Sequence, residues 1–156
     1  MDGATQVIGT NYYDTPTASP AGIGFTLNYE GTKYTEYSVS PDGWILLGGA
    51  TAVNQFSNAT TSATNVPKIY PYWDDLATGT TGNVKILVTG SAPNRIFKVQ
   101  WFVTIPRATG GAANSTFQAW LYESSNQIEF RYGTLGTDAS GGSSVGLTGA
   151  TATNFQ

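Results

Sequence analysis

The sequence predicts an all-β protein, an antiparallel β-sandwich of the jelly-roll or lectin-like type with about eight to ten strands. Short runs of branched and aromatic residues recur between clusters of Gly, Pro, Asn and Ser. Several of these runs alternate apolar and polar residues, as a half-buried strand does. No stretch combines a sustained helical period with a capping residue, so no helix is expected.

The expected strands recur along the chain from residue 23 to residue 147. They span residues 23–29, 34–40, 44–47, 84–89, 95–104, 116–123, 127–132 and 144–147. The segment Ser40-Pro41-Asp42-Gly43 is typical of a tight turn, so residues 34–47 are predicted to form a hairpin. The strands on either side of the short turn at 124–126 are expected to pair with each other and with 95–104, all antiparallel.

The domain organisation expected from the sequence is simple. Residues 1–20 form an N-terminal strand and linker, and residues 21–156 form the sandwich domain. Two stretches, 48–66 and 133–143, have the composition of long loops, which on a rigid sandwich commonly carry function.

Composition excludes several classes of function. The chain has no His and no Cys, which rules out Ser-His-Asp and Cys-His nucleophiles and the usual zinc sites. Its net charge of -3 and its seven scattered Lys and Arg residues make nucleic acid an unsuitable partner. No apolar run is long enough for membrane insertion. We therefore expect a protein that is not an enzyme.

Charged residues make up only 11% of the chain, and Thr, Ser, Gly and Tyr are abundant. This composition favours a secreted or cell-surface protein. The start, Met1-Asp2-Gly3-Ala4, lacks the features of a signal peptide, so a mature or recombinant form is expected.

The segment Trp73-Asp74-Asp75 has two interpretations. The favoured one is structural: the Trp is core, and the carboxylates of Asp74 and Asp75 fix the turn that follows the strand. The alternative makes both acids calcium ligands, although calcium takes six to eight oxygens and only two acids are adjacent here. No other cofactor is expected. Arg95 is predicted to pair with one of these acids.

A glycosidase would need two carboxylates facing one cleft. Glu123 and Glu129 lie on neighbouring expected strands, but no compact acidic motif surrounds them. We interpret them as solvated cross-strand charges.

Exposed aromatic residues are candidates for binding sugars. Trp44, Trp73 and Trp101 stand in apolar strand contexts and are expected in the core. Trp120 is expected on the opposite face of its strand from its apolar neighbours, and on the same face as Gln118 and Tyr122. These three residues are the predicted ligand-binding candidates.

Two further features concern the surface. Asn58 and Asn114 begin N-x-[ST] sequences in expected loops and are glycosylation candidates. The N-terminal run that includes Thr5, Val7 and Ile8 is a candidate assembly strand. It either closes its own sheet or adds to an open edge of another copy, as strand addition does in fibres.

Several segments, in order, resemble one family. The segments are YSVSPDGWI at 37–45, IYPYWDDL at 69–76, GSAPNRIFKVQW at 90–101, residues 117–132, and SVGL at 144–147. They are similar to secreted bacterial β-sandwich surface modules related to the nidogen-type extracellular domain. Asp42 departs from the family pattern, which has Asn before the Gly, and the Cys residues of animal relatives are absent. The resemblance implies a secreted adhesive module with a lectin-like sandwich and no catalytic machinery.

The expected function is therefore a non-catalytic extracellular module for adhesion or self-assembly, including assembly into a filament by strand addition. Its partners are then other copies of itself or other surface proteins. A carbohydrate-binding, lectin-like domain, with or without calcium, is the alternative.

Overall fold

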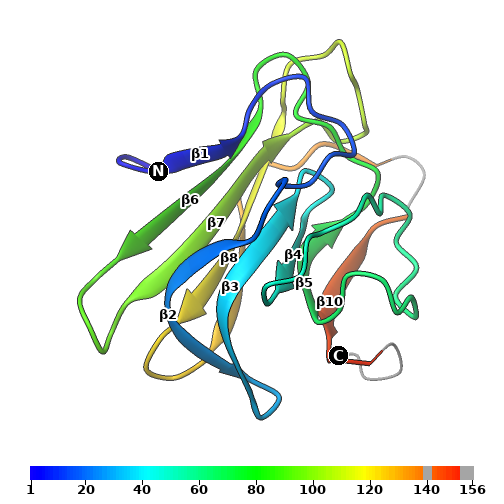
Figure 1. Cartoon of the computed structure of the whole chain (residues 1–156). Helices are drawn as coiled ribbons and strands as arrows, with labels where there is room; N and C mark the ends of the chain where they lie inside the picture. The colour runs from blue at the N-terminus through cyan, green and yellow to red at the C-terminus, as the bar shows by residue number, and fades with distance from the viewer. Residues whose placement is uncertain (139–141, 152–156) are drawn as a thin grey trace.

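The computed structural model describes residues 1–138 and 142–151, in which ten strands form two antiparallel five-stranded sheets (Figure 1). The strands are β1 (Thr5–Ile8), β2 (Ala21–Tyr29), β3 (Thr32–Ser40), β4 (Trp44–Leu47), β5 (Lys68–Trp73), β6 (Asn83–Thr89), β7 (Ile96–Val103), β8 (Ser115–Tyr122), β9 (Ile128–Tyr132) and β10 (Ser144–Thr148). One sheet has the order β1-β6-β7-β8-β9, and the other has the order β10-β5-β4-β3-β2. The predicted β-sandwich is confirmed.

The predicted hairpin at 34–47 is confirmed as β3 and β4, with Ser40 opposite Trp44. The turn between them closes with the Gly43 amide donating to the Ser40 carbonyl at 3.3 Å. Gly43 has a φ of 80°, and a Cβ there would lie 1.8 Å from the Tyr72 carbonyl oxygen. Only glycine therefore allows β5 to approach this turn so closely.

The prediction for the C-terminal half is also confirmed. β7 pairs with β8, and β8 pairs with β9, both antiparallel. In the short turn before β9, Asn126 adopts a φ of 54°, and its amide donates to the Tyr122 carbonyl at 3.0 Å. Asn tolerates this left-handed conformation better than most residues, so the turn fixes the register of β8 and β9.

The main core lies between the two sheets. Alternate residues of β2, β7 and β8 are fully buried, which gives these strands the strict period of two that the sequence shows. At its centre the Trp101 ring stacks on Phe117 with 5.2 Å between ring centroids. The Trp101 indole nitrogen donates to the Ser40 carbonyl at 2.7 Å, so the ring is buried with its polar atom satisfied.

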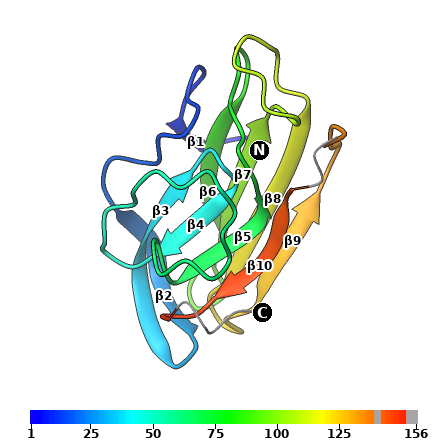
Figure 2. The same ribbon diagram turned by 90° about the vertical axis from the view of Figure 1, so that its right-hand side faces the viewer.

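A second, smaller core lies on the outer side of the β10-β5-β4-β3-β2 sheet. It consists of Trp44, Leu46, Ala52, Tyr70 and Trp73. Residues 48–66, here called the covering loop, pass in front of β4 and β5 in Figure 2 and enclose this cluster. Trp44 and Trp73 are therefore buried as predicted, but beneath a loop and not between the sheets.

Gln55 holds the covering loop in place. Its backbone carbonyl accepts hydrogen bonds from the indole nitrogens of Trp44 and Trp73, each at 3.1 Å. Its side-chain oxygen accepts from the Lys68 ammonium at 2.5 Å. Lys68 is 1% exposed, and its Nζ lies 3.6 Å from the Trp73 ring centroid. Burial lowers the pKa of Lys68 to about 7.

The N-terminal segment joins the sandwich through β1, which pairs antiparallel with the first half of β6. Thr5 and Gln6 are exposed, Val7 is half-buried, and only Ile8 is buried in the core. β1 therefore occupies the edge of its own sheet, which is one of the two arrangements expected for it. In the part of the chain that the structure describes, no helix is long and apolar enough to cross a membrane.

Candidate functional site

The outward side chains of the β1-β6-β7-β8-β9 sheet form the candidate site, here called the open face. Strand alternation and register place these side chains in rows across the sheet. One row is Gln6, Lys85, Gln100, Gln118 and Arg131. The next is Leu87, Lys98, Trp120 and Glu129, and beside it Tyr122 lies opposite Ile96. The structure thus brings all three predicted ligand-binding residues onto one polar surface.

Trp120 is the centre of the open face. The Lys98 Nζ lies 3.9 Å from the centroid of its ring, and the Arg131 Cζ lies 3.5 Å from it. Lys98 comes from β7 and Arg131 from β9, which flank β8 on opposite sides, so the two cations approach the indole from opposite sides. Trp120 is half-buried. A sugar could stack on this ring only by displacing a cation, so we do not expect ring stacking here.

Hydrogen bonds connect the polar side chains around Trp120. The Trp120 indole nitrogen donates to the Gln118 side-chain oxygen at 2.6 Å, and the Gln118 amide donates to the Gln100 oxygen at 2.8 Å. On the other side, the Tyr122 hydroxyl donates to Glu129 at 2.5 Å. Arg131 donates to the same carboxylate through Nε at 2.8 Å. The surface is therefore organised before any ligand arrives.

Hydrogen bonds and charges within this network shift the pKa values of Glu129 and Tyr122. Hydrogen bonds from Arg131 and then Tyr122 lower the pKa of Glu129. The bond to Glu129 raises the pKa of the Tyr122 hydroxyl. Glu129 therefore stays ionised at neutral pH, and Tyr122 stays neutral.

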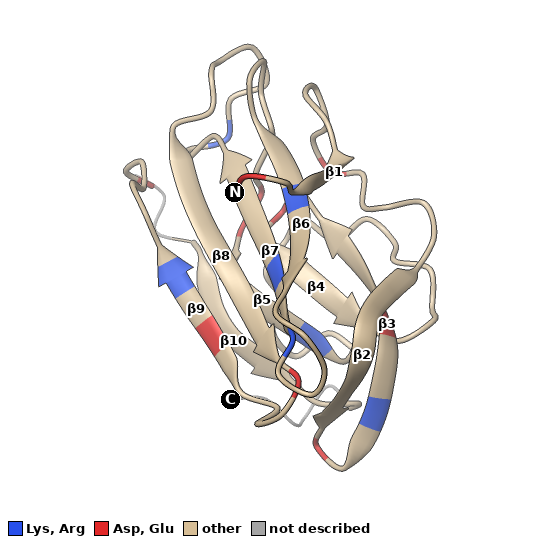
Figure 3. Cartoon of the chain, turned by 90° about the vertical axis from the view of Figure 1, so that its left-hand side faces the viewer, with Lys and Arg blue, Asp and Glu red and all other residues tan. Residues whose placement is uncertain are grey.

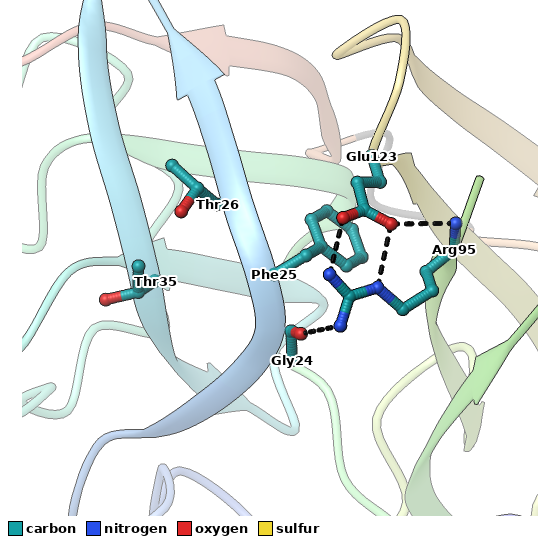
Figure 4. Close-up of a pocket in the computed structure, with 6 residues that line it drawn as sticks. All are labelled: Gly24, Phe25, Thr26, Thr35, Arg95 and Glu123. Carbon is teal, nitrogen blue, oxygen red and sulfur yellow. Dashed lines mark hydrogen bonds and ion pairs between the residues drawn. The ribbon is translucent and has the colours of Figure 1, made fainter. Parts of the chain in front are cut away.

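Arg95 does not pair with Asp74 or Asp75, and that prediction is wrong. Its guanidinium instead binds Glu123 with two nitrogens, Nε at 2.7 Å and Nη2 at 2.5 Å (Figure 4). A third nitrogen donates to the Gly24 carbonyl of β2 at 2.5 Å, which ties the edge of one sheet to the other. Glu123 directly follows β8 and Arg95 directly precedes β7, so the two paired strands place these groups side by side. Sequence separation alone does not reveal this pairing.

This ion pair lines a surface pocket of about 460 Å³, together with Gly24, Phe25, Thr26 and Thr35. The bonds from Arg95 lower the pKa of Glu123. A general acid of a glycosidase needs a raised pKa, so Glu123 lacks the property that this role demands. Glu123 and Glu129, the two acids that a glycosidase would need, form ion pairs with Arg95 and Arg131 instead.

The carboxylates of Asp74 and Asp75, the two predicted calcium ligands, have different neighbours in the structure. Asp74 accepts a hydrogen bond from the Asp75 amide at 2.9 Å, which is the predicted turn chemistry. Asp75 lies instead near Asp14 and Asp42, with one carboxylate oxygen from each within 4.8 Å of the others. Sequence reasoning missed Asp14 and Asp42, because they are far from Asp75 along the chain and only the fold brings them together.

Arg107 supplies positive charge to this acidic group. Its Nε lies 2.8 Å from Asp75, and its Nη2 lies 3.2 Å from Asp14. Both oxygens of Asp42 are engaged, one by the Leu76 amide at 3.1 Å and the other by the Ser40 hydroxyl at 2.9 Å. The arrangement suits a structural ion-pair network better than a calcium site, which needs more oxygens. Calcium binding stays a prediction.

The two glycosylation candidates differ in their surroundings. Asn58 is half-buried in the covering loop. Asn114 donates its amide nitrogen to the Ile105 carbonyl at 2.8 Å and accepts from the Ile105 amide at 2.9 Å. A glycan on Asn114 would attach to a nitrogen that already holds a loop, so Asn58 is the better candidate. Its modification stays a prediction.

The fold defines a class, the antiparallel β-sandwich of two five-stranded sheets. The whole chain, residues 1–156, matches the model of the family described as NIDO related, so the protein belongs to that family. The resemblance to nidogen-type domains seen in the sequence is thereby confirmed. Neither the comparison with curated proteins nor the comparison with solved structures gave a match.

Proposed function

We propose that this protein is a non-catalytic extracellular module for adhesion that contacts its partner through the open face. The observation that carries the proposal is the contrast between this face and the opposite one: the covering loop encloses one outer sheet face, whereas an organised set of polar side chains is presented on the other. Membership of a family of extracellular type supports the location.

The side chains available for chemistry also support a binding role. Without His or Cys, the Ser-His-Asp and Cys-His nucleophiles are unavailable. Glu123 and Glu129 are each held ionised by an arginine, so neither serves as a proton donor at neutral pH. These residues can recognise a ligand by charge and hydrogen bonding.

Adhesion is tested with beads that carry the chain at a fixed density. Attachment is measured to whole cells and to surfaces coated with collagen or with polysaccharides. The double variant Lys98→Glu/Arg131→Glu reverses the charge of the open face, and Lys33→Glu is the control, an exposed cation on β3 of the other sheet. We expect the double variant to lose attachment and the control to keep it. Equal attachment by all three proteins would contradict the proposal.

Self-assembly by strand exchange is the second candidate, and the weak attachment of β1 favours it. Ile8 is the only one of its four residues buried in the core. The chain is tied to its own body again at Asn11, whose amide donates to the Gly79 carbonyl at 2.9 Å. The exchangeable arm is therefore residues 1–10, which spans at most about 35 Å when extended.

Light scattering of the purified chain at increasing concentration tests this candidate. Exchange predicts oligomers that disappear when residues 1–9 are removed. A synthetic peptide of residues 4–9 should then bind the shortened chain at β6. A wild-type chain that stays monomeric at millimolar concentration would exclude assembly through β1.

A further inference from the structure

We propose that the open face binds an anionic polysaccharide, a polymer that carries repeated carboxylate or sulfate groups. The inference rests on the proposed adhesive function and specifies its ligand. Recognition works through cations and amide groups laid out across the sheet, not through stacking of sugar rings on Trp120.

The distribution of charge is the first support. The strands of the sheet that bears the open face carry three cations, Lys85, Lys98 and Arg131, and one acid, Glu129. The cations lie on β6, β7 and β9 (Figure 3). This sheet thus has a net charge of +2 in a chain whose net charge is -3, which leaves -5 for the rest. A polyanion is therefore attracted to this sheet and repelled elsewhere, with a range of about 10 Å in dilute salt.

The positions of the cations are the second support. The Trp120 ring holds Lys98 on one side and Arg131 on the other by cation–π contact, and Glu129 further restrains Arg131. Because Lys98 Nζ lies 3.9 Å and Arg131 Cζ lies 3.5 Å from the same ring centroid, the two charged groups stand at fixed positions no more than about 7.4 Å apart. Binding costs little side-chain entropy, because the cations are ordered before the ligand arrives.

Amide groups between the cations supply the third support. The Gln100 side chain uses its oxygen to accept from Gln118. Its nitrogen makes no hydrogen bond to any other side chain or backbone group within residues 1–138 and 142–151, so two N–H donors remain for a ligand. Gln100 lies in the same row as Lys85, Gln118 and Arg131. Two amides between two cations suit a polymer that carries hydroxyls between its anionic groups.

The same features disfavour other polyanions and protein partners. Single-stranded nucleic acid is held largely by stacking of bases on exposed aromatic rings, and two cations already lie against the Trp120 ring. A protein partner would be expected to insert a large anchor into an apolar pocket. The open face offers instead half-buried side chains that are mostly polar, with Ile96 and Phe102 as the apolar ones on β7.

The test measures binding by isothermal titration calorimetry and by retention on immobilised polymer at low salt. The probes are polygalacturonate for carboxylates, dextran sulfate for sulfates, neutral dextran as the uncharged control, and oligo-dT as the non-saccharide polyanion. The variant is Lys85→Gln/Lys98→Gln/Arg131→Gln, the control is Lys33→Gln, which removes one exposed cation from the other sheet, and Gln100→Leu tests the amide donors. Circular dichroism and urea midpoints verify that each variant folds.

We expect wild type to bind at least one anionic polysaccharide, to bind neutral dextran not at all, and to bind oligo-dT at least tenfold more weakly. Removing one exposed cation weakens such binding by up to about fivefold. The triple variant should therefore lose at least tenfold, Lys33→Gln less than twofold, and Gln100→Leu about threefold or more. The affinity should fall as salt rises.

Three results would overturn the inference. The first is that neither anionic polymer binds. The second is that Lys33→Gln and the triple variant lose the same affinity, and the third is that oligo-dT binds as tightly as the polysaccharides. If polysaccharide binding is absent while the beads still attach to cells or collagen through the open face, the ligand class is wrong and the adhesive function stands. If the beads also fail to attach, both are wrong.

Discussion

The two outer faces of the sandwich are built differently on the same scaffold. On the β10-β5-β4-β3-β2 sheet, Trp44, Tyr70 and Trp73 point outward, and the covering loop encloses them. On the other sheet, most outward positions hold polar or charged side chains, and the ring of the one Trp among them is contacted by two cations. The apolar Leu87, Ile96 and Phe102 share this face. The apolar outer face is covered by a loop of the same chain, whereas a polar outer face can remain in contact with water.

The two sides of the sandwich also differ in the environment of a lysine that contacts a tryptophan ring. Lys68 and Lys98 both lie against tryptophan rings, at 3.6 Å and 3.9 Å from the centroids. Lys68 is buried and has a lowered pKa, whereas Lys98 is half-exposed and belongs to a network of charged groups. The same contact thus stabilises a closed core on one side and holds a cation ready for a ligand on the other.

The largest expected difference between the faces is the stability contribution of their tryptophans. Trp73→Ala opens a cavity under the covering loop and removes one of the two indole donors to the Gln55 carbonyl, so we expect a loss of about 3–5 kcal/mol in the free energy of unfolding. Trp120→Ala should cost about 1 kcal/mol, because its side chain is half-exposed. Urea unfolding measures both. Equal losses would mean that the faces are packed alike.

The buried lysine should make stability depend on pH. The pKa of Lys68 is about 7 in the folded protein and near 10.5 when unfolded, so between these values the unfolded chain binds more protons. Stability should therefore rise from pH 7 to 10.5, by at most about 1.4 kcal/mol per pH unit from this group, and be lost as pH falls through this range.

Lys68→Met removes this part of the pH dependence, and Lys98→Met on the open face is the matched control. Urea unfolding at a series of pH values compares their slopes with that of wild type. A slope unchanged by Lys68→Met would show that the lysine is not held in a dry environment.

A smaller effect is expected at Asp42, in the turn between β3 and β4. Burial raises its pKa to about 8, so the folded chain binds more protons than the unfolded one between about pH 4 and 8, and stability falls across that window as pH rises. In Asp42→Asn the amide keeps both hydrogen bonds, accepting from Leu76 and donating to Ser40. We expect a gain of about 1–3 kcal/mol at pH 8 and little change at pH 4. A loss at pH 8 would contradict the assigned protonation state.

Much of the fold could be predicted because its signals are local. The alternation in β7, β8 and β9 and the turn residues at 40–43 and 124–126 define strands and hairpins within a short stretch of chain. The pairing of β1 with β6 and of β10 with β5 joins distant segments, and no local pattern specifies it.

In the candidate site too, local patterns predict some features, whereas others depend on contacts between distant segments. The alternation placed Gln118, Trp120 and Tyr122 on one face, and the short turn before β9 could also have placed Arg131 beside Trp120, because it sets the register. The partner of Arg95 and the grouping of Asp14 with Asp42 and Asp75 depend on which distant strands meet. The burial of Lys68 depends on how the covering loop folds back, which its composition does not encode in any periodic pattern.

The most direct measurement is an NMR titration of the ¹⁵N-labelled chain with polygalacturonate and with dextran sulfate, which follows backbone and side-chain amides. We expect shifts at Gln100, Gln118 and the Trp120 indole, and along β9, with the covering loop and the indoles of Trp44 and Trp73 unchanged. Shifts confined to the covering loop, or spread evenly over both sheets, would contradict the assignment of binding to the open face.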